Sequence, residues 1–484
     1  MPDHGKVMTN TIYNIIKTVS AVLFPLIVFP YITRVLQPAC LGKVNFVNSI
    51  ISYISLMASL GIGTYAVREC AKYRNDKEKL SVTASQIFSI NLVSMSLAYA
   101  ALFIIVLLVP KVRNDLELVA ILSIPIIFQT LGCEWINTAM EDLKFISIRT
   151  CCFQLLSLLA IFILVQNPED YLLYAVISAA ASVGANIVNM LYRRRYCKIS
   201  YSGRMNARQH LKPIVSLFVL TLSQTVFLNL DVTMIGFFLG DSDVGIYSVA
   251  VKIYNLASTL ISAITIVVIP QLSFADNEKN VSEMGRLQKY AFDYIAFLGI
   301  PIVIGISLFP GDIVKLVAGE NYMAAIPVLR IFSLALFIVM FGGAFLGNIV
   351  LLSVSKEKFF MYATLIATII NAVLNYIFIP VCGIIAAGVT TVIAEIVIFF
   401  IVFTKGNKYL YAQGLLKDLA QPVIASIPFL AVKALSYLLK IDSYLFSICV
   451  IVSCVLLYFV MMILLKNEFV YTFITGIKKR GKQK

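Results

Sequence analysis

Charged residues are scarce in this sequence. Asp, Glu, Lys and Arg make up 13% of its 484 residues, whereas hydrophobic residues make up 60%. Because soluble domains carry about 25% charged residues, this composition excludes a soluble globular protein. It indicates an integral membrane protein, and the long apolar stretches described below predict that it is built entirely from α-helices.

Residues and motifs that carry chemistry are scarce as well. The two histidines, His4 and His210, lie outside the predicted membrane spans, and none of the nine cysteines forms a CxxC motif. A metal site or a disulfide framework is therefore not expected. The sequence also has no P-loop, no glycine-rich nucleotide motif and no nucleophile with a matching base. We expect no cofactor and no enzymatic reaction.

The excess of basic residues follows from membrane topology. The formal net charge is +14. With both termini placed in the cytoplasm, and with Arg149 and Lys289 at the inner ends of their spans counted with the inner side, 29 of the 39 Lys and Arg residues fall on the inner side and 6 in outer loops, which is the positive-inside bias. Clusters such as 193–195 would face anionic lipid headgroups. We therefore expect membrane lipids as partners and no nucleic acid.

About 14 apolar stretches are long enough to cross the hydrocarbon, which takes roughly 20 residues of helix. The first is too long for the apolar part of a signal peptide, so we interpret it as a retained helix. An even number of spans places both termini on one side. The predicted spans are 11–33, 44–67, 81–109, 117–139, 148–166, 171–192, 213–239, 246–273, 288–309, 327–353, 359–379, 383–404, 418–439 and 444–465.

The two halves of the chain share a polar pattern. Five polar positions of the second span recur 203 residues later, and Gly42 matches Gly245, where we assign both glycines to turns that enter a helix. Spans 1 and 7 cross in the same direction, so a duplication predicts two six-helix lobes related by a parallel internal repeat, followed by two C-terminal helices. The matching residues are Asn45, Ser49, Ser52, Ser55 and Ser59, then Ser248, Lys252, Asn255, Ser258 and Ser262.

This duplication predicts the domain organisation. The N-lobe, with spans 1 to 6, takes residues 1–192, and a basic cytoplasmic linker takes 193–212. The C-lobe, with spans 7 to 12, takes 213–404, and the last two spans with a basic tail take 405–484.

Polar side chains also recur three and four residues apart in other spans, so they share one helical face. In a bilayer such side chains face protein or water. Because stripes occur in both halves, we interpret them as the walls of a hydrated cavity, with simple helix packing as the alternative. The stripes are Thr130, Glu134, Asn137, Glu141; Ser178, Ser182, Asn186, Asn189; Thr221, Gln224, Thr225, Asp231; and Thr364, Thr368, Asn371, Asn375.

Charged residues within the spans are open to two interpretations. Lys17 either snorkels to the cytosolic surface or serves the cavity, whereas Arg330 and Lys433 are interpreted as snorkelling side chains. Asp231 and Lys252 flank the short turn at 240–245 and could pair. Such a pair is either structural or opened by an anionic substrate or a coupling cation.

Motifs in both halves resemble those of one family. In the first half they are LFPLIVFPYITRVLQPACLGKVNF, LGIGTYAVRECAKYR and WINTAMEDLKFISIRT, and in the second half LDVTMIGFFLGDSDVGIYSVAVKIYN and IVKLVAGENYMAAIPVLRIF. Their order over nearly the full length is similar to that of polysaccharide repeat-unit flippases of the Wzx type, in the multidrug/oligosaccharidyl-lipid/polysaccharide exporter superfamily. Cys40 and the 61–63 segment depart from the family pattern, which questions only the local turn geometry.

The resemblance implies two helical bundles facing a central cavity and transport by alternating access. The implied substrate is an undecaprenyl-pyrophosphate-linked oligosaccharide, moved from the inner to the outer leaflet of a bacterial cytoplasmic membrane. Cavity cations would bind the pyrophosphate by charge-assisted hydrogen bonds. Carried over by motif, the candidates are Lys17, Arg34, Arg68, Arg149 and Lys252. Candidates for the cavity wall or for a coupling ion, H⁺ or Na⁺, are Asn45, Ser52, Glu134, Asp231, Asn255, Asn371 and Asn375.

Other functions stay open from the sequence. A drug/cation antiporter of the same superfamily would need an acidic cavity, for which Asp231, Asp293 and Glu395 are available. A lipid II flippase is a second relative. A polytopic glycosyltransferase or polymerase is less favoured, because such enzymes need a sizeable outer loop and the longest here is 310–326. Enzymes of these two kinds from the same pathway are expected partners.

Overall fold

The computed structural model describes residues 4–202, 207–439, 441, 443–467 and 469–470. These residues form helices and connecting segments, with no β-strand among them. The chain divides into two compact units, Met1–Gly245 and Ile246–Lys484. The predicted all-α class is therefore confirmed.

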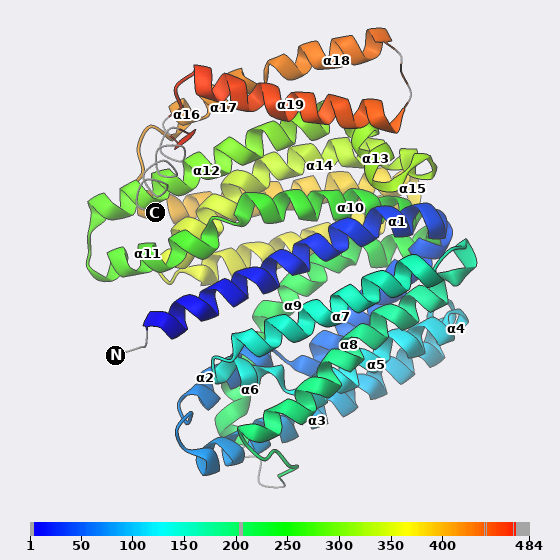
Figure 1. Cartoon of the computed structure of the whole chain (residues 1–484), viewed down its shortest axis with the longest axis vertical. Coiled ribbons are helices and arrows are strands. Elements are labelled where there is room, and N and C mark those ends of the chain that lie inside the picture. Colours follow the sequence, from blue (N-terminus) through cyan, green and yellow to red (C-terminus); the bar gives the residue numbers. More distant parts are fainter. Residues whose placement is uncertain (1–3, 203–206, 440, 442, 468, 471–484) are drawn as a thin grey trace. The chain divides into compact units, whose positions relative to one another are not determined.

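The first unit is a bundle of long helices (Figure 1). Within it α1 packs against α3, α7 and α9, and α5 packs against α8. Its helices are α1 (His4–Ser59), α2 (Ile62–Ala71), α3 (Lys77–Leu108), α4 (Pro110–Asn114), α5 (Leu116–Gly132), α6 (Glu134–Ala139), α7 (Leu143–Leu164), α8 (Tyr171–Tyr192) and α9 (Ala207–Phe238), with short 3₁₀ turns at Pro168–Asp170 and Arg193–Arg195.

The second unit is a bundle of the same kind, and α10 (Asp241–Ser262) begins just before the boundary. Here α15 packs against α14 and η4, a π-helical stretch, and α12 packs against α11 and α14. The elements are α11 (Thr265–Asn277), α12 (Val281–Leu308), α13 (Pro310–Ala318), η3 (Glu320–Ala325), α14 (Ile326–Val339), η4 (Met340–Leu351), α15 (Glu357–Gly406), η5 (Asn407–Tyr409), α16 (Leu415–Asp418), α17 (Ala420–Ser426), α18 (Pro428–Leu439) and α19 (Tyr444–Leu464).

Eleven helical segments of the described chain are long and apolar enough to cross a membrane, and α5 is a shorter apolar helix. Two of the eleven contain a break in helical geometry. In α1 it lies at Gln37 (φ 60°), directly before Pro38, and in α15 it lies at Gly383 (φ 65°). A residue before proline is disfavoured in the helical region, and glycine tolerates positive φ. Each of these two helices covers two predicted spans, so the structure is compatible with fourteen.

Gly42 and Gly245 correct one expectation from the sequence. Both lie within helices rather than turns. A Cβ atom on Gly42 would lie 1.6 Å from the Asp241 carbonyl oxygen, and one on Gly245 would lie 2.0 Å from that of Pro38. The two glycines therefore allow the broken part of α1 and the first turn of α10 to touch backbone to backbone.

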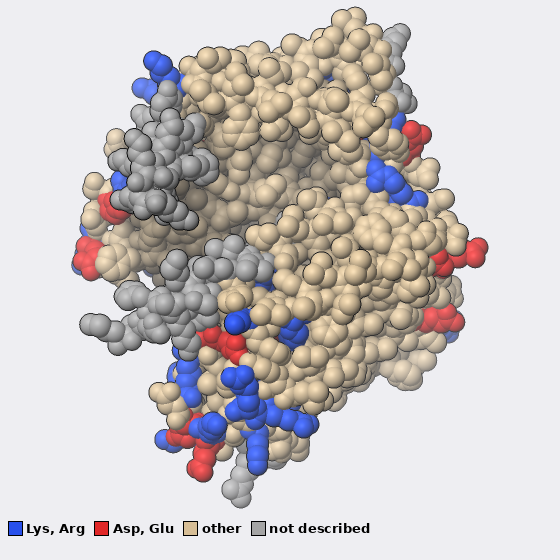
Figure 2. All heavy atoms as spheres, viewed as in Figure 1, with Lys and Arg blue, Asp and Glu red and all other residues tan. Residues whose placement is uncertain are grey.

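Most charged side chains on one face of the protein lie near the ends of the helices (Figure 2). On the face seen in Figure 2, Lys, Arg, Asp and Glu gather near the helix ends, and the surface between them is almost free of charge. Many large apolar side chains are exposed there and elsewhere, for example Leu108, Ile163 and Val381. This distribution fits a belt of hydrocarbon around the protein.

Candidate functional site

A polar pocket of about 530 Å³ lies in the first unit between α1, α5 and α9. No charged residue is among those that line it. The polar stripes predicted for the second and seventh spans meet here, with Gln129 of α5 opposite them. The polar lining consists of Asn48, Ser52, Ser55, Ser59, Gln129, Thr221, Thr225 and Asn229, and we call it the hydroxyl pocket.

Four of these eight side chains, those of Ser52, Ser59, Thr221 and Asn229, donate to a backbone carbonyl of their own helix. Ser52 Oγ donates to the Asn48 carbonyl at 2.8 Å, and Thr221 Oγ1 lies 3.1 Å from that of Leu217. A hydroxyl that donates its proton in this way still has lone pairs that accept hydrogen bonds. The hydroxyl pocket therefore suits a neutral ligand rich in O–H groups, such as a sugar.

The sequence stripes were out of register at some positions. Gln129 lines the hydroxyl pocket, whereas Thr130, the predicted stripe residue, is buried away from it. Neighbouring residues on a helix point about 100° apart, so an error of one position moves a side chain off the pocket wall. Ser49 is likewise buried, where Thr233 Oγ1 donates to its hydroxyl at 2.9 Å. Asn45 is half-buried and is not among the lining residues.

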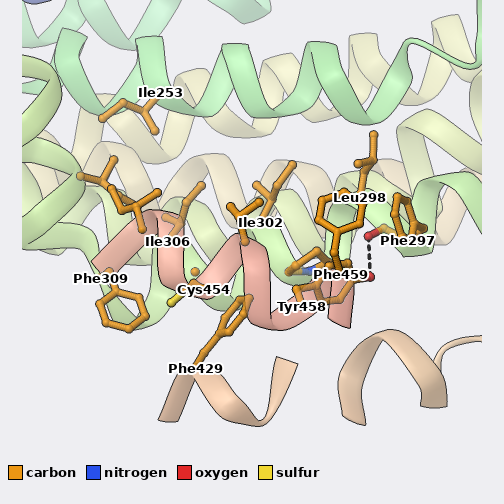
Figure 3. Close-up of a pocket in the computed structure, with 15 residues that line it drawn as sticks. Ile253, Phe297, Leu298, Ile302, Ile306, Phe309, Phe429, Cys454, Tyr458 and Phe459 are labelled. Atoms are coloured by element: carbon orange, nitrogen blue, oxygen red, sulfur yellow. Dashed lines mark hydrogen bonds between the residues drawn. The ribbon is translucent and has the colours of Figure 1, made fainter. Parts of the chain in front are cut away.

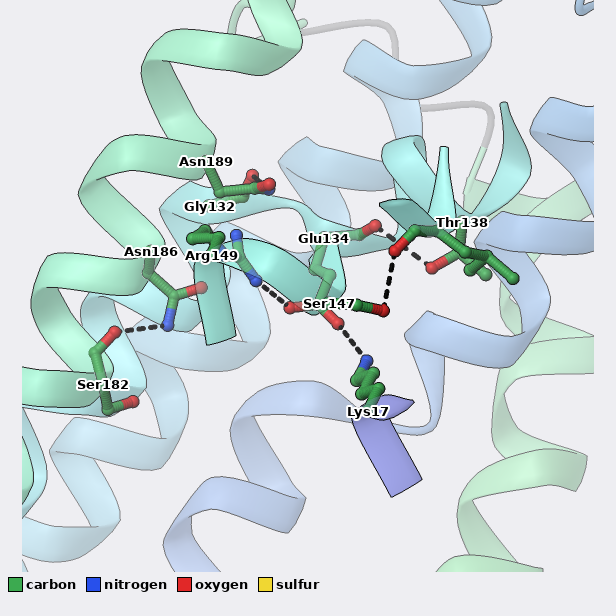
Figure 4. Close-up of polar contacts among 10 residues, drawn as sticks. Lys17, Gly132, Glu134, Thr138, Ser147, Arg149, Ser182, Asn186 and Asn189 are labelled. Carbon is green, nitrogen blue, oxygen red and sulfur yellow. Dashed lines mark hydrogen bonds and ion pairs between the residues drawn. The ribbon is translucent and has the colours of Figure 1, made fainter. Parts of the chain in front are cut away.

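Two predicted cations meet at one carboxylate (Figure 4). Lys17 Nζ of α1 lies 2.9 Å from Glu134 Oε1, and Arg149 Nη2 of α7 lies 2.5 Å from Glu134 Oε2. The direction of this carboxylate is set by the break between α5 and α6. The backbone of Cys133 lies in the left-handed region (φ 51°), and Glu134 is the first residue of α6. The cluster carries two positive charges and one negative charge.

Arg149 is the most deeply buried member of this cluster. Its side chain is 4% exposed, whereas those of Lys17 and Glu134 are 36% and 37% exposed. Among the described residues, the Nε and Nη1 atoms of Arg149 have no hydrogen-bond partner. Buried guanidinium N–H groups normally have acceptors, so these two donors are available to an anionic ligand.

A second polar pocket, of about 330 Å³, adjoins this cluster. It lies between α7 and α8, with Phe24 of α1 at one wall. Gln154 of its lining has a buried Oε1 that no described residue bonds to. We call it the arginine pocket, and its polar lining is Glu134, Arg149, Thr150, Gln154, Ser157, Ser178, Ser182 and Asn186.

Arg34 and Arg68, the other predicted cations of the first unit, have contacts of their own. Arg34 is exposed and donates to the Pro30 carbonyl of its own helix at 2.6 Å. Arg68 is 67% exposed, lies 3.9 Å from Glu69 and stands over the Tyr65 ring. Lys252 is half-buried in the second unit. Lys17 and Arg149 are thus the two cations of the predicted set that the first unit brings together.

Polar candidates in the second unit form a buried network along α15. Asn375 Nδ2 donates to Asn371 Oδ1 at 3.1 Å, and Thr390 Oγ1 donates to Asn375 Oδ1 at 2.5 Å. The break at Gly383 folds the two halves of α15 onto each other, which explains how residues 15 apart in sequence can meet. Asp231 is buried in α9 of the first unit, and Asn255 is half-buried in α10.

The second unit also contains an apolar pocket of about 360 Å³ (Figure 3). Its walls come mainly from α12 and α19, with Phe429 of α18 and Ile253 of α10. The polar end of Tyr458 is satisfied, because its Oη donates to the Phe297 carbonyl at 2.7 Å. The lining includes no charged side chain, so the pocket suits a hydrocarbon chain. Sequence patterns did not single it out, because its residues look like any lipid-facing helix.

The fold is that of multi-pass membrane transporters. A solved structure of the lipid II flippase MurJ, in an inward closed conformation, matches with a TM-score of 0.73 and 16% identity over 95% of this chain and all of that chain. An inward-facing multidrug resistance MATE family transporter of the MOP superfamily matches with a TM-score of 0.60 and 18% identity, covering 82% of this chain and 95% of the other.

The family model for polysaccharide biosynthesis proteins matches residues 7–275, more than half of the chain, and the MatE model matches 217–377. The chain belongs to the polysaccharide biosynthesis protein family. A relative described as a putative O-antigen transporter of Escherichia coli (strain K12) is 24% identical over 416 residues, which is 83% of this chain and 97% of that protein. The resemblance stated from the sequence motifs is confirmed.

Proposed function

We propose that this protein is a flippase that moves undecaprenyl-pyrophosphate-linked oligosaccharides from the inner to the outer leaflet for surface polysaccharide synthesis. Relatives named as a putative O-antigen transporter, a probable low-salt glycan biosynthesis flippase and a probable flippase support this function. The observation that carries it is Arg149, a buried guanidinium at the wall of the arginine pocket, with two N–H donors that have no partner in the part of the chain that the structure describes.

The pyrophosphate would bind at the Lys17–Glu134–Arg149 cluster. Phosphate oxygens are acceptors that a planar guanidinium can hold with two parallel hydrogen bonds. In this structure Lys17 Nζ and Arg149 Nη2 each donate a hydrogen bond to the Glu134 carboxylate. An arriving phosphate would compete with Glu134 for both cations, so substrate binding and release of Lys17 from α6 would be linked.

The other two parts of the substrate match the other two pockets. The uncharged acceptors of the hydroxyl pocket suit sugar O–H groups. The apolar pocket of the second unit, taken by itself, suits an isoprenoid chain, because a hydrocarbon chain is kept away from water there as it is in lipid. We propose Arg34, Arg68 and Lys252 as further cationic contacts along the path, reached at other stages of alternating access.

The cellular setting is part of the proposal. We place the protein in a bacterial cytoplasmic membrane with both termini in the cytoplasm, where the basic inner segments satisfy the positive-inside rule. Glycosyltransferases that build the repeat unit and a polymerase that extends it would act before and after this step. A gradient of H⁺ or Na⁺ would drive it.

The test is complementation of a strain that lacks this gene. Arg149→Gln removes the buried positive charge, and we expect loss of surface polysaccharide at unchanged protein level. Arg149→Lys keeps the positive charge but lacks the planar guanidinium, and this variant should restore part of the surface polysaccharide. Arg113→Gln is the matched control, because Arg113 is exposed in α4. Normal polymer from the Arg149→Gln variant would contradict the proposal.

Two related functions are separated by simple measurements. A drug/cation antiporter would need excess negative charge at its binding site, whereas the cluster around Glu134 has excess positive charge. If a strain that lacks this gene became sensitive to drugs, that result would favour the antiporter. A lipid II flippase would make the gene essential for growth, whereas loss of surface polysaccharide with continued growth supports the function proposed here.

A further inference from the structure

A single carboxyl group lies deep inside the second unit. Glu395 is 6% exposed and lies twelve residues beyond the break at Gly383, in a helix that continues to Gly406. At the helical rise this places it about 18 Å from the break, close to the middle of the second apolar half of α15. None of the three pockets described above includes Glu395 in its lining.

The Glu395 carboxyl group accepts a hydrogen bond from a neutral side chain. Tyr254 Oη of α10 donates to Glu395 Oε1 at 3.3 Å. The Tyr254 ring is held against Phe332 of α14, with ring centroids 5.0 Å apart. Among the described residues, no Lys, Arg or His nitrogen lies within ion-pair distance of Glu395.

The elements around Glu395 bring few other charges. The single charged residue of α14 is Arg330, which is exposed, and η4 has none. On α10, Lys252 lies two positions before Tyr254 and so points about 200° around the helix from it. On α15 itself, Lys405 stands ten residues away, and Lys408 and Tyr409 of η5 lie beyond it. Tyr254 and Tyr247 of α10 both pack against Phe332, and it is Tyr254 that donates a hydrogen bond to Glu395.

An ionised carboxylate in this position would be costly. Burial in a low-dielectric interior without a cation strongly disfavours the charged form, and one phenol hydrogen bond does not replace the lost hydration. The neutral acid keeps the bond from Tyr254 and loses little on burial. Acidic residues inside membrane helices commonly belong to proton pathways for this reason.

We propose that Glu395 is a proton-binding residue of this protein. It holds a proton as a neutral acid in the conformation described here, and it releases that proton to water when the contact between α10, α14 and α15 opens. Coupling to transport rests on the proposed flippase function: one proton would bind from the outer side and leave to the cytoplasm in each cycle. Protonation of Glu395 itself does not depend on that function.

Infrared spectroscopy of the purified protein in lipid vesicles tests protonation directly. At neutral pH we expect a carboxylic-acid C=O band that shifts in D₂O, that is absent from Glu395→Gln and that is retained in Glu357→Gln. Glu357 is the matched control because it is an exposed glutamate at the start of the same helix. In Tyr254→Phe, which loses the hydrogen bond, the band should move to higher frequency and persist.

A difference spectrum without any acid band lost in Glu395→Gln would overturn the proposal. The coupling step has its own readout, the rate of substrate translocation with and without an imposed proton gradient. The wild type should respond to the gradient and Glu395→Gln should not; a variant that still responds would refute coupling through Glu395. If the wild type moves no substrate at all while the infrared band is present, the flippase function fails and proton binding stands.

Discussion

Glu134 is the residue on which the arrangement of the cationic site depends, because both Lys17 and Arg149 bond to its carboxylate. In Glu134→Gln the buried Arg149 loses its charged partner. We expect unfolding free energy to fall by about 1–3 kcal/mol, and thermal unfolding in detergent measures it. Glu169→Gln, at an exposed site of η1 (Pro168–Asp170), should leave stability unchanged.

Although Glu134→Gln should lower the stability of the protein, it should strengthen the binding of an anionic ligand. Without the Glu134 carboxylate, a phosphate anion no longer competes for the two cations. Affinity for pyrophosphate should therefore rise by up to about tenfold, which is ~1.4 kcal/mol. Calorimetry of the purified variant measures this, and weaker binding than in the wild type would show that Glu134 supports the anion site instead of blocking it.

Asp142 predicts a pH dependence at one end of the first unit. Burial opposes its ionisation, but hydrogen bonds from Tyr192 Oη (2.7 Å), Tyr196 Oη (2.5 Å) and the Phe145 N–H outweigh this and lower the pKa of Asp142. A carboxyl whose pKa is lower in the folded protein stabilises the fold above its unfolded pKa, about 3.9. That contribution is lost as the pH falls through the folded value.

Asp142→Asn should consequently be less stable than the wild type at neutral pH, by about 1–2 kcal/mol. The difference between the two proteins should shrink below about pH 4. Unfolding midpoints in detergent between neutral and acidic pH measure it. A difference that stays constant down to the lowest pH would mean that ionisation of Asp142 contributes nothing.

At the scale of elements, a row of serines on α3 binds the linker segment 198–202, which follows α8 and the short turn at Arg193–Arg195. Backbone N–H groups of Lys198, Ser200 and Ser202 donate to the hydroxyls of Ser81, Ser85 and Ser89, at 3.3, 3.2 and 2.7 Å. Four residues of helix rise about 6.0 Å and two extended residues about 6.6 Å, so every second linker residue meets every fourth helix residue. The spacing of alternate N–H groups along the linker therefore matches the spacing of the serine hydroxyls along α3.

Replacing Ser81, Ser85 and Ser89 together by alanine should release this linker. Its amide protons at 198, 200 and 202 would lose their acceptors, and their exchange with deuterium should become at least about tenfold faster, equal to ~1.4 kcal/mol of local protection. Ser96→Ala is the control, because Ser96 bonds to Leu92 of its own helix. Unchanged exchange would mean that other contacts hold the linker.

Helices were more predictable than their breaks. Apolar length alone located the spans, since lipid leaves the backbone little choice but a helix. The break at Gln37 falls between the predicted spans 11–33 and 44–67. The break at Cys133 lies inside the predicted span 117–139 and was not foreseen, because cysteine does not favour positive φ and tertiary packing imposes it. The break at Cys133 matters most, because it separates α6 from α5 and turns Glu134 toward Lys17 and Arg149.

At the scale of the whole molecule, composition and charge bias were enough to predict a multi-pass helical membrane protein. The site was predictable only in part. The residue types of the stripes and cations could be recognised, and Lys17 and Arg149 do meet, but spacing within one helix cannot tell which helices touch. The bond from Lys17 to Glu134, and the apolar pocket beside Tyr458, depend on contacts between residues more than a hundred positions apart.

The most direct measurement of the central claim uses the purified protein in liposomes. An undecaprenyl-pyrophosphate-linked oligosaccharide is supplied in one leaflet, and its appearance in the other is followed with an impermeant sugar-modifying reagent. We predict translocation well above that of empty liposomes for the wild type and Arg113→Gln, and none above that level for Arg149→Gln. No translocation by the wild type, or equal rates for Arg149→Gln and the wild type, would contradict the account.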